Sequence, residues 1–132
     1  MKNRNMRRKN YARHNLKHRQ SKTSTGTQLT AIRVFLDDER ITPDGWVRVY
    51  WPDEAISLLE SGCVQEISLD HDLGDDERGT GYDVILWIEE AVALRSFVPP
   101  KIFVHSANSS ARRKMEAGIA AIQKLMENRF QR

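Results

Sequence analysis

Short apolar runs and longer stretches of helical periodicity alternate along this chain. Four short apolar runs predict buried strands, at residues 32–36, 46–50, 66–69 and 101–104. Three longer segments with apolar residues at helical spacing predict helices, one from Pro52 to the Ser61-Gly62 stop and two at residues 82–94 and 109–128. The order strand, strand, helix, strand, helix, strand, helix is typical of an α/β domain.

The connections between these elements favour a small parallel sheet. Right-handed crossovers give a doubly wound, flavodoxin-like arrangement of about four strands in the order 2-1-3-4, and we expect helices on both faces. In this order the first and third strands are neighbours on either side of the switch point. Ligands of such sheets bind at the carboxyl ends of the strands, near that point.

Composition limits the class of protein. A length of 132 residues with 39% hydrophobic residues fits one domain with a modest core. Cys63 is the only cysteine, so an intramolecular disulfide is excluded. No apolar run approaches the ~20 residues of a membrane span, and the N-terminus lacks the apolar stretch of a secretion signal. We therefore expect a cytoplasmic protein that does not enter a membrane.

Charge divides the chain into two parts. Residues 1–30 hold nine Lys and Arg and no acidic residue, and they end in a polar linker at residues 21–27. The remaining residues carry 12 basic and 18 acidic side chains, a net charge of −6. We predict a disordered basic arm at 1–30 and an α/β domain at 31–132. The arm is either a solvated tail or a contact for nucleic acid.

Carboxylates follow two of the predicted strands. Asp37 and Asp38 come directly after the first strand, and Asp70 comes directly after the third. Because the carboxyl ends of parallel strands share one edge, these side chains are expected to converge. Converging carboxylates repel one another unless a cation is present, and their oxygens suit Mg²⁺ or Mn²⁺. The alternative is a set of solvated carboxylates at loop starts.

Histidines and phosphate-binding groups lie at the same predicted edge. His71 and His105 follow the third and fourth strands, where an imidazole is able to transfer protons. Ser106 and Asn108 offer hydroxyl and amide groups to an anion, and Arg112 lies in the first turns of the last helix. The alternatives are structural histidines, an N-cap at Asn108 and a solvated helix face at Arg112.

The residues at the strand ends resemble those of the phosphoacceptor receiver domains of two-component signalling. Asp37 and Asp38, Asp70 and Ser106 match the acidic pair, the phosphoacceptor aspartate and the hydroxyl residue of receivers. The resemblance implies a receiver-like fold, Mg²⁺ at the acidic residues and phosphoryl transfer to Asp70. The chain departs from receivers because it has no counterpart of the fifth strand and of the lysine that ends it.

Four segments resemble a receiver-derived family, the cyclic-phosphate processing receiver domain, more specifically. They are residues 34–40 (VFLDDER), 67–74 (ISLDHDLG), 79–83 (GTGYD) and 104–108 (VHSAN). The resemblance covers nearly all of residues 32–125 and implies metal-dependent hydrolysis of a cyclic phosphate on a nucleotide or an RNA end.

In that interpretation the predicted edge residues divide into three roles. The metal ligands are Asp37, Asp38 and Asp70, the proton-transfer residues are His105 and His71, and the phosphate contacts are Ser106, Asn108 and Arg112. Asp70 as a phosphoryl-accepting nucleophile stays open. Two other functions also stay open: a receiver-like module that binds phosphate or a nucleotide without turnover, and a nucleic-acid adaptor that acts through the basic arm.

Overall fold

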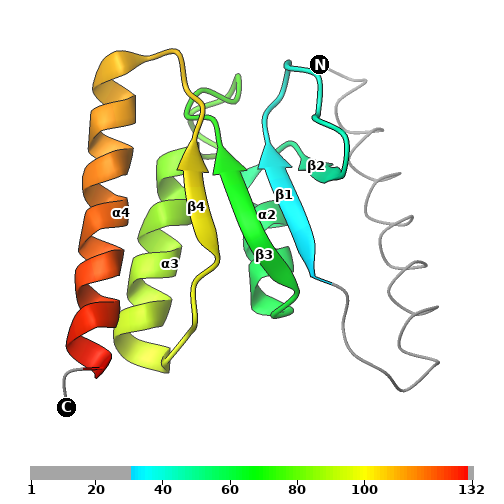
Figure 1. Ribbon diagram of the computed structural model, residues 1–132. Coiled ribbons are helices and arrows are strands. Elements are labelled where there is room, and N and C mark those ends of the chain that lie inside the picture. Colours follow the sequence, from blue (N-terminus) through cyan, green and yellow to red (C-terminus); the bar gives the residue numbers. More distant parts are fainter. Residues whose placement is uncertain (1–30, 131–132) are drawn as a thin grey trace, which may run out of the picture.

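The structure, a computed structural model, describes residues 31–130 as a four-stranded sheet with three helices (Figure 1). The strands are β1 (Ile32–Leu36), β2 (Trp46–Val49), β3 (Val64–Leu69) and β4 (Lys101–Val104). The helices are α2 (Pro52–Glu60), α3 (Gly81–Arg95) and α4 (Ser109–Phe130). The predicted basic arm, residues 1–30, lies outside the described residues. No helix in the described part of the chain is long and apolar enough to cross a membrane.

The sheet has the predicted topology. All three strand pairs are parallel, and the strand order is β2-β1-β3-β4. In the register, Leu36 pairs with Leu69 and Leu69 pairs with Val104, so β1, β3 and β4 end at the same level. The residues that follow these three strands therefore begin side by side.

One face of the sheet packs against the three described helices, and none of these helices covers the other face. Val34, Leu36, Ile67 and Leu69 are fully buried and belong to the same apolar cluster as residues of α2, α3 and α4. In Figure 1, α2 and α3 lie behind the sheet, and α4 packs along α3 at the β4 edge. Phe35 lies between the core residues Val34 and Leu36 in β1, so its side chain points to the opposite face.

All three described helices lie on the core face of the sheet, so a helix on the opposite face is not found within residues 31–130. In a sheet of order 2-1-3-4, the step from β1 to β2 runs across the sheet in one direction, and the later steps run in the other. A right-handed crossover helix between β1 and β2 would therefore cover the opposite face. Here residues 37–45 connect β1 to β2 without a helix. The strand order and the number of described helices agree with the prediction.

Two predicted strand boundaries differ by one or two residues. β2 ends at Val49, because the Glu54 Oε1 atom accepts hydrogen bonds from the backbone N–H groups of Tyr50 (2.9 Å) and Trp51 (3.0 Å) and so turns the chain into α2. β3 begins at Val64 because this residue pairs with Ile32 at the start of β1.

The loop from β3 to α3 is fixed at both ends. Leu73 is fully buried in the core. At the start of α3, the Gly81 N–H donates to the His71 carbonyl at 3.2 Å. A Cβ atom at Gly81 would lie 1.9 Å from the Asp70 carbonyl oxygen, so only glycine lets the helix approach the end of β3 this closely. The start of α3 therefore lies directly against the Asp70 backbone.

Candidate metal centre

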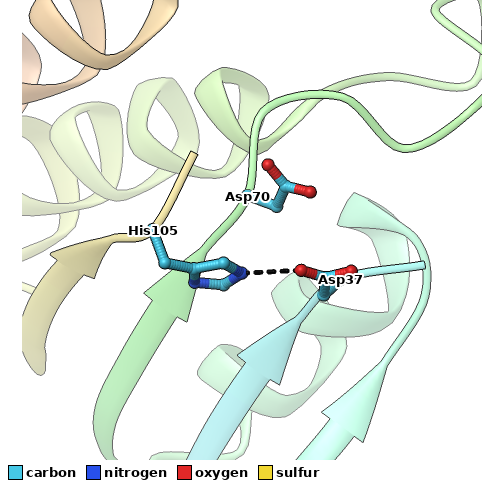
Figure 2. A group of neighbouring side chains, drawn as sticks. All are labelled: Asp37, Asp70 and His105. Atoms are coloured by element: carbon cyan, nitrogen blue, oxygen red, sulfur yellow. Dashed lines mark hydrogen bonds and ion pairs between the residues drawn. The ribbon is translucent and has the colours of Figure 1, made fainter. Parts of the chain in front are cut away.

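Asp37, Asp70 and His105 form one group at the carboxyl edge of the sheet (Figure 2). Each is the first residue after its strand, and each continues the hydrogen-bonded ladder through its backbone N–H. The acceptors are the carbonyls of Val49 (3.2 Å), Leu36 (3.0 Å) and Leu69 (3.0 Å), respectively. One ligand atom from each side chain lies within 4.8 Å of the other two.

The Asp37 carboxylate is buried and strongly hydrogen-bonded. Its Oδ1 atom accepts hydrogen bonds from the backbone N–H groups of Glu39 (2.7 Å) and Arg40 (2.8 Å), and its Oδ2 atom lies 3.0 Å from His105 Nε2. Burial raises the pKa of Asp37, but the two backbone donors and His105 outweigh it and hold the pKa below its ordinary value. Asp37 is therefore ionised at neutral pH.

Three neighbours surround the His105 ring. Nε2 faces Asp37, Nδ1 lies 2.7 Å from Ser68 Oγ, and the Phe35 ring stacks on the imidazole with centroids 4.4 Å apart and an interplanar angle of 3°. Burial lowers the pKa of His105 below its ordinary value, although Asp37 and Asp70 partly oppose it. The neutral imidazole, which is the form that binds metals, is thereby favoured.

Asp70 has the opposite electrostatic environment. Burial and the negative charge of Asp37 raise the pKa of Asp70, and the backbone N–H of His71, which donates to Asp70 Oδ1 at 2.8 Å, offsets this only in part. The ionised form of Asp70 is thus costly without a neighbouring positive charge. A cation between Asp37 and Asp70 would remove this cost.

The donor set fits a divalent metal ion. In Figure 2 the His105 ring points toward the Asp37 carboxylate and Asp70 lies beside them, with one ligand atom of each side chain within 4.8 Å of the other two. Carboxylate oxygen suits Mg²⁺ and Mn²⁺, whereas imidazole nitrogen is more typical of transition metals. The set that the structure brings together contains His105 where the sequence analysis expected Asp38.

Asp38 lies next to this group, in an open cleft. The cleft, about 310 Å³ in volume, is lined by Asp37, Asp38, Glu39, Arg40, Asp70, Asp72, Gly74 and Ala107. This volume is at the low end for small-molecule sites, and it suits a phosphate group with part of a nucleotide.

The other predicted site residues lie around the cleft and do not line it. The His71 imidazole is held by Asp72, with 2.9 Å between Nδ1 and Oδ1. Asn108 Oδ1 accepts a hydrogen bond from the Ala111 N–H at 3.1 Å and so caps the start of α4, and Ser106 Oγ accepts one from the Asn108 N–H at 3.1 Å in the turn before it. Arg112 pairs with Glu116 on the surface of α4 (3.4 Å).

Sequence reasoning missed three residues of the site. Arg40 lines the cleft, with its Nε atom 3.9 Å from Asp37 Oδ2, and its guanidinium donates to the His105 carbonyl. Ser68 and Phe35 contact the His105 ring. Strand alternation places Ser68 on the same face as Asp70, and Phe35 on the same face as Asp37. The strand alternation can be read from the sequence, but it does not show that Ser68 and Phe35 contact the His105 ring.

Comparison with known proteins gives one match. The family described as the cyclic-phosphate processing receiver domain matches residues 32–121, which include all four strands and most of α4. No curated protein and no solved structure matches the chain. The matched region contains Asp37, Asp70 and His105.

Proposed function

The chain belongs to the cyclic-phosphate processing receiver domain family, and from this membership and the geometry of the cleft we propose that it hydrolyses a cyclic phosphodiester with the help of a divalent metal ion. The substrate class is a nucleotide or an RNA end that carries a cyclic phosphate. The observation that carries this proposal is the grouping of Asp37, Asp70 and His105 beside a cleft of phosphate size.

Asp37, Asp70 and His105 would hold the metal ion, which we expect to be Mn²⁺ or Mg²⁺. Asp37 contributes a carboxylate that stays ionised, and His105 contributes a neutral imidazole. Such an ion supplies Lewis acidity toward a phosphoryl oxygen and favours the ionisation of water. The mixed nitrogen and oxygen donors favour Mn²⁺ over Mg²⁺.

We assign proton transfer to His71, which does not itself line the cleft but is hydrogen-bonded to the cleft residue Asp72. In the reaction, the oxygen of water bonds to phosphorus and one ring P–O bond breaks. The water proton moves to the imidazole of His71, which then protonates the departing alkoxide oxygen, so the residue is regenerated. Asp72 accepts a hydrogen bond from His71 Nδ1 and orients the ring, which leaves Nε2 for the proton.

Arg40 is the cation best placed to contact the substrate phosphate. It lines the cleft, while Arg112 is paired with Glu116 outside it. A guanidinium beside the carboxylates also reduces the net negative charge that a phosphate anion meets as it enters. Ser106 and Asn108 support the site indirectly through their hydrogen bonds at the start of α4, next to Ala107 of the cleft.

The test is a direct assay of turnover. The full chain is incubated with 2′,3′-cyclic nucleotides and with a short RNA that ends in a cyclic phosphate, in Mn²⁺, in Mg²⁺ or in EDTA, and products are separated by chromatography. We expect ring opening that requires metal and that is lost in Asp70→Asn and His105→Ala. Asp44→Asn is the matched control, because Asp44 precedes β2 at the opposite edge of the sheet.

The results of this assay distinguish a metal-dependent hydrolase from a receiver-like module that binds phosphate. Ring opening in EDTA would reject the metal-dependent mechanism. Metal binding without turnover of any cyclic phosphate would reject the hydrolase and favour a receiver-like module that binds phosphate. Incorporation of label from a small phosphodonor at Asp70 would favour the same module and a nucleophilic role for this aspartate.

A further inference from the structure

Ser68 and Phe35 hold the His105 ring from two directions. They are paired neighbours on β3 and β1, and both lie one row below the metal site on the face of the sheet that the described helices do not cover. Phe35 packs flat against the imidazole and fixes its plane, while Ser68 Oγ lies 2.7 Å from Nδ1. The Ser68 residue is only 8% exposed, so water does not readily replace its hydroxyl.

The Nε2 atom of His105 has two possible partners that require different tautomers. In the structure it lies 3.0 Å from the ionised Asp37 carboxylate, an arrangement that requires a proton on Nε2. To bind a metal ion together with Asp37 and Asp70, Nε2 must instead present its lone pair, and the proton of the neutral ring must be on Nδ1.

Ser68 is compatible with both tautomers because a hydroxyl both donates and accepts hydrogen bonds. When Nε2 carries the proton, the Ser68 O–H donates to Nδ1. When Nδ1 carries the proton, Ser68 Oγ accepts from it. A carboxylate or a carbonyl at this position would favour only the second state, and an ammonium group only the first.

We propose that Ser68 is a positioning residue that lets His105 change from a hydrogen-bond donor toward Asp37 into a metal ligand. The proposal rests on the metal-binding part of the proposed function and goes beyond it, because it assigns how the chain prepares that ligand. The exchange moves one proton from Nε2 to Nδ1 through solvent, and the charge of the imidazole is the same before and after.

The first test is spectroscopic and needs no turnover. In the full chain labelled with ¹⁵N-histidine, long-range ¹H–¹⁵N spectra report which ring nitrogen of His105 carries the proton. We expect Nε2–H in EDTA and Nδ1–H with Zn²⁺, a diamagnetic probe for the site. A proton that stays on Nε2 with bound metal, or a wild type that binds no metal, would overturn the proposal.

The second test compares Mn²⁺ affinity among serine variants by calorimetry. Ser68→Ala leaves the Nδ1–H of the loaded state without an acceptor, and we expect affinity to fall by about 10–100-fold. Ser68→Thr keeps the hydroxyl and should bind close to wild type. Ser61→Ala removes a hydroxyl that caps the end of α2 and should have no effect.

The role of Ser68 and the hydrolase activity can be rejected independently of each other. A Ser68→Ala variant that binds Mn²⁺ as tightly as wild type would reject the role of Ser68, whether or not the protein is a hydrolase. A wild type that shows the change of tautomer but opens no cyclic phosphate would reject the hydrolase and retain this role. If Ser68→Ala does not fold, the wild-type spectra still test the change of tautomer, and a Ser68→Thr variant that binds Mn²⁺ much more weakly than wild type would reject the role of the hydroxyl.

Discussion

Asp37 and His105 form a hydrogen-bonded pair across the sheet, with 3.0 Å between Asp37 Oδ2 and His105 Nε2. The two residues follow β1 and β4, which are separated by β3 in the sheet. Their side chains meet above β3, next to Asp70 and Ser68. The pair therefore connects three strands at one point, and a change at either residue should alter the properties of the other.

Replacing Asp37 should lower the pKa of His105 further. Burial already lowers this pKa, and the hydrogen bond and charge of Asp37 are the main effects that oppose the shift. In Asp37→Asn the charge is lost, so the imidazolium form becomes less favourable. NMR titration of the His105 ring in EDTA measures the effect. An unchanged or higher pKa in the variant would contradict the electrostatic interpretation.

His105 should make the metal-free protein less stable as the pH is lowered below 6.5. The folded-state pKa of His105 is below the ordinary value of 6.5, so in that window the unfolded chain binds a proton that the folded chain does not. The contribution of His105 to the free energy of unfolding therefore rises with pH up to about 6.5 and then levels off. Urea unfolding at several pH values in EDTA tests this, and His105→Gln should flatten the slope.

Asp70→Asn should abolish metal binding and stabilise the metal-free protein. The pKa of Asp70 is raised by burial and by the charge of Asp37, so the ionised carboxylate at neutral pH destabilises the metal-free fold. We expect the variant to be more stable than wild type in EDTA. Excess Mn²⁺ should raise the Tm of wild type but not that of the variant. A variant less stable than wild type in EDTA would show that Asp70 has a structural role instead.

The positions of Asp37, Asp70 and His105 at one edge could be predicted from the sequence because each follows an apolar run. The polar residue that ends a buried strand must lie where the strand leaves the core, and parallel strands end together. The order of the strands followed from the handedness of crossovers. Both predictions depend on the positions of the strands, which the strong hydrophobic pattern of this chain marks clearly.

The partners of these side chains could not be predicted in the same way. Periodicity gives the face on which Ser68 and Phe35 lie, but the contact with His105 depends on the register of three strands and on rotamers. The choice of His105 over Asp38 as the third member of the group depends on the same details. Within residues 31–130 the helices lie on one face because residues 37–45 connect β1 to β2 without a helix, a feature that does not follow from the strand order.

Arg40 and Arg112 should differ in their effect on turnover. Arg40 lines the cleft and contacts the site, whereas Arg112 pairs with Glu116 on the surface. A charged hydrogen bond to a phosphate contributes about 1.5–3 kcal/mol, so Arg40→Gln should reduce kcat/KM by about 10–100-fold. Arg112→Gln should change it little. Equal losses in both variants would restore Arg112 as the phosphate contact expected from sequence.

Gly81→Ala should disturb the metal site through the backbone of Asp70. The new Cβ atom would lie 1.9 Å from the Asp70 carbonyl oxygen, so the start of α3 and the end of β3 must separate. We expect a loss of about 1–3 kcal/mol in the free energy of unfolding and, in addition, weaker Mn²⁺ binding by the folded variant.

Gly118→Ala is the control that distinguishes displacement of the Asp70 backbone from overpacking elsewhere in the protein. Its Cβ atom would lie 2.6 Å from Ile85 Cγ2, between α4 and α3, and it would not approach Asp70. This contact is with a side-chain methyl group rather than a backbone carbonyl, and alanine favours the helix, so the loss of stability should be smaller. Calorimetric titration should give wild-type Mn²⁺ affinity for Gly118→Ala. If Gly81→Ala also binds Mn²⁺ like wild type, the close approach of α3 does not position Asp70.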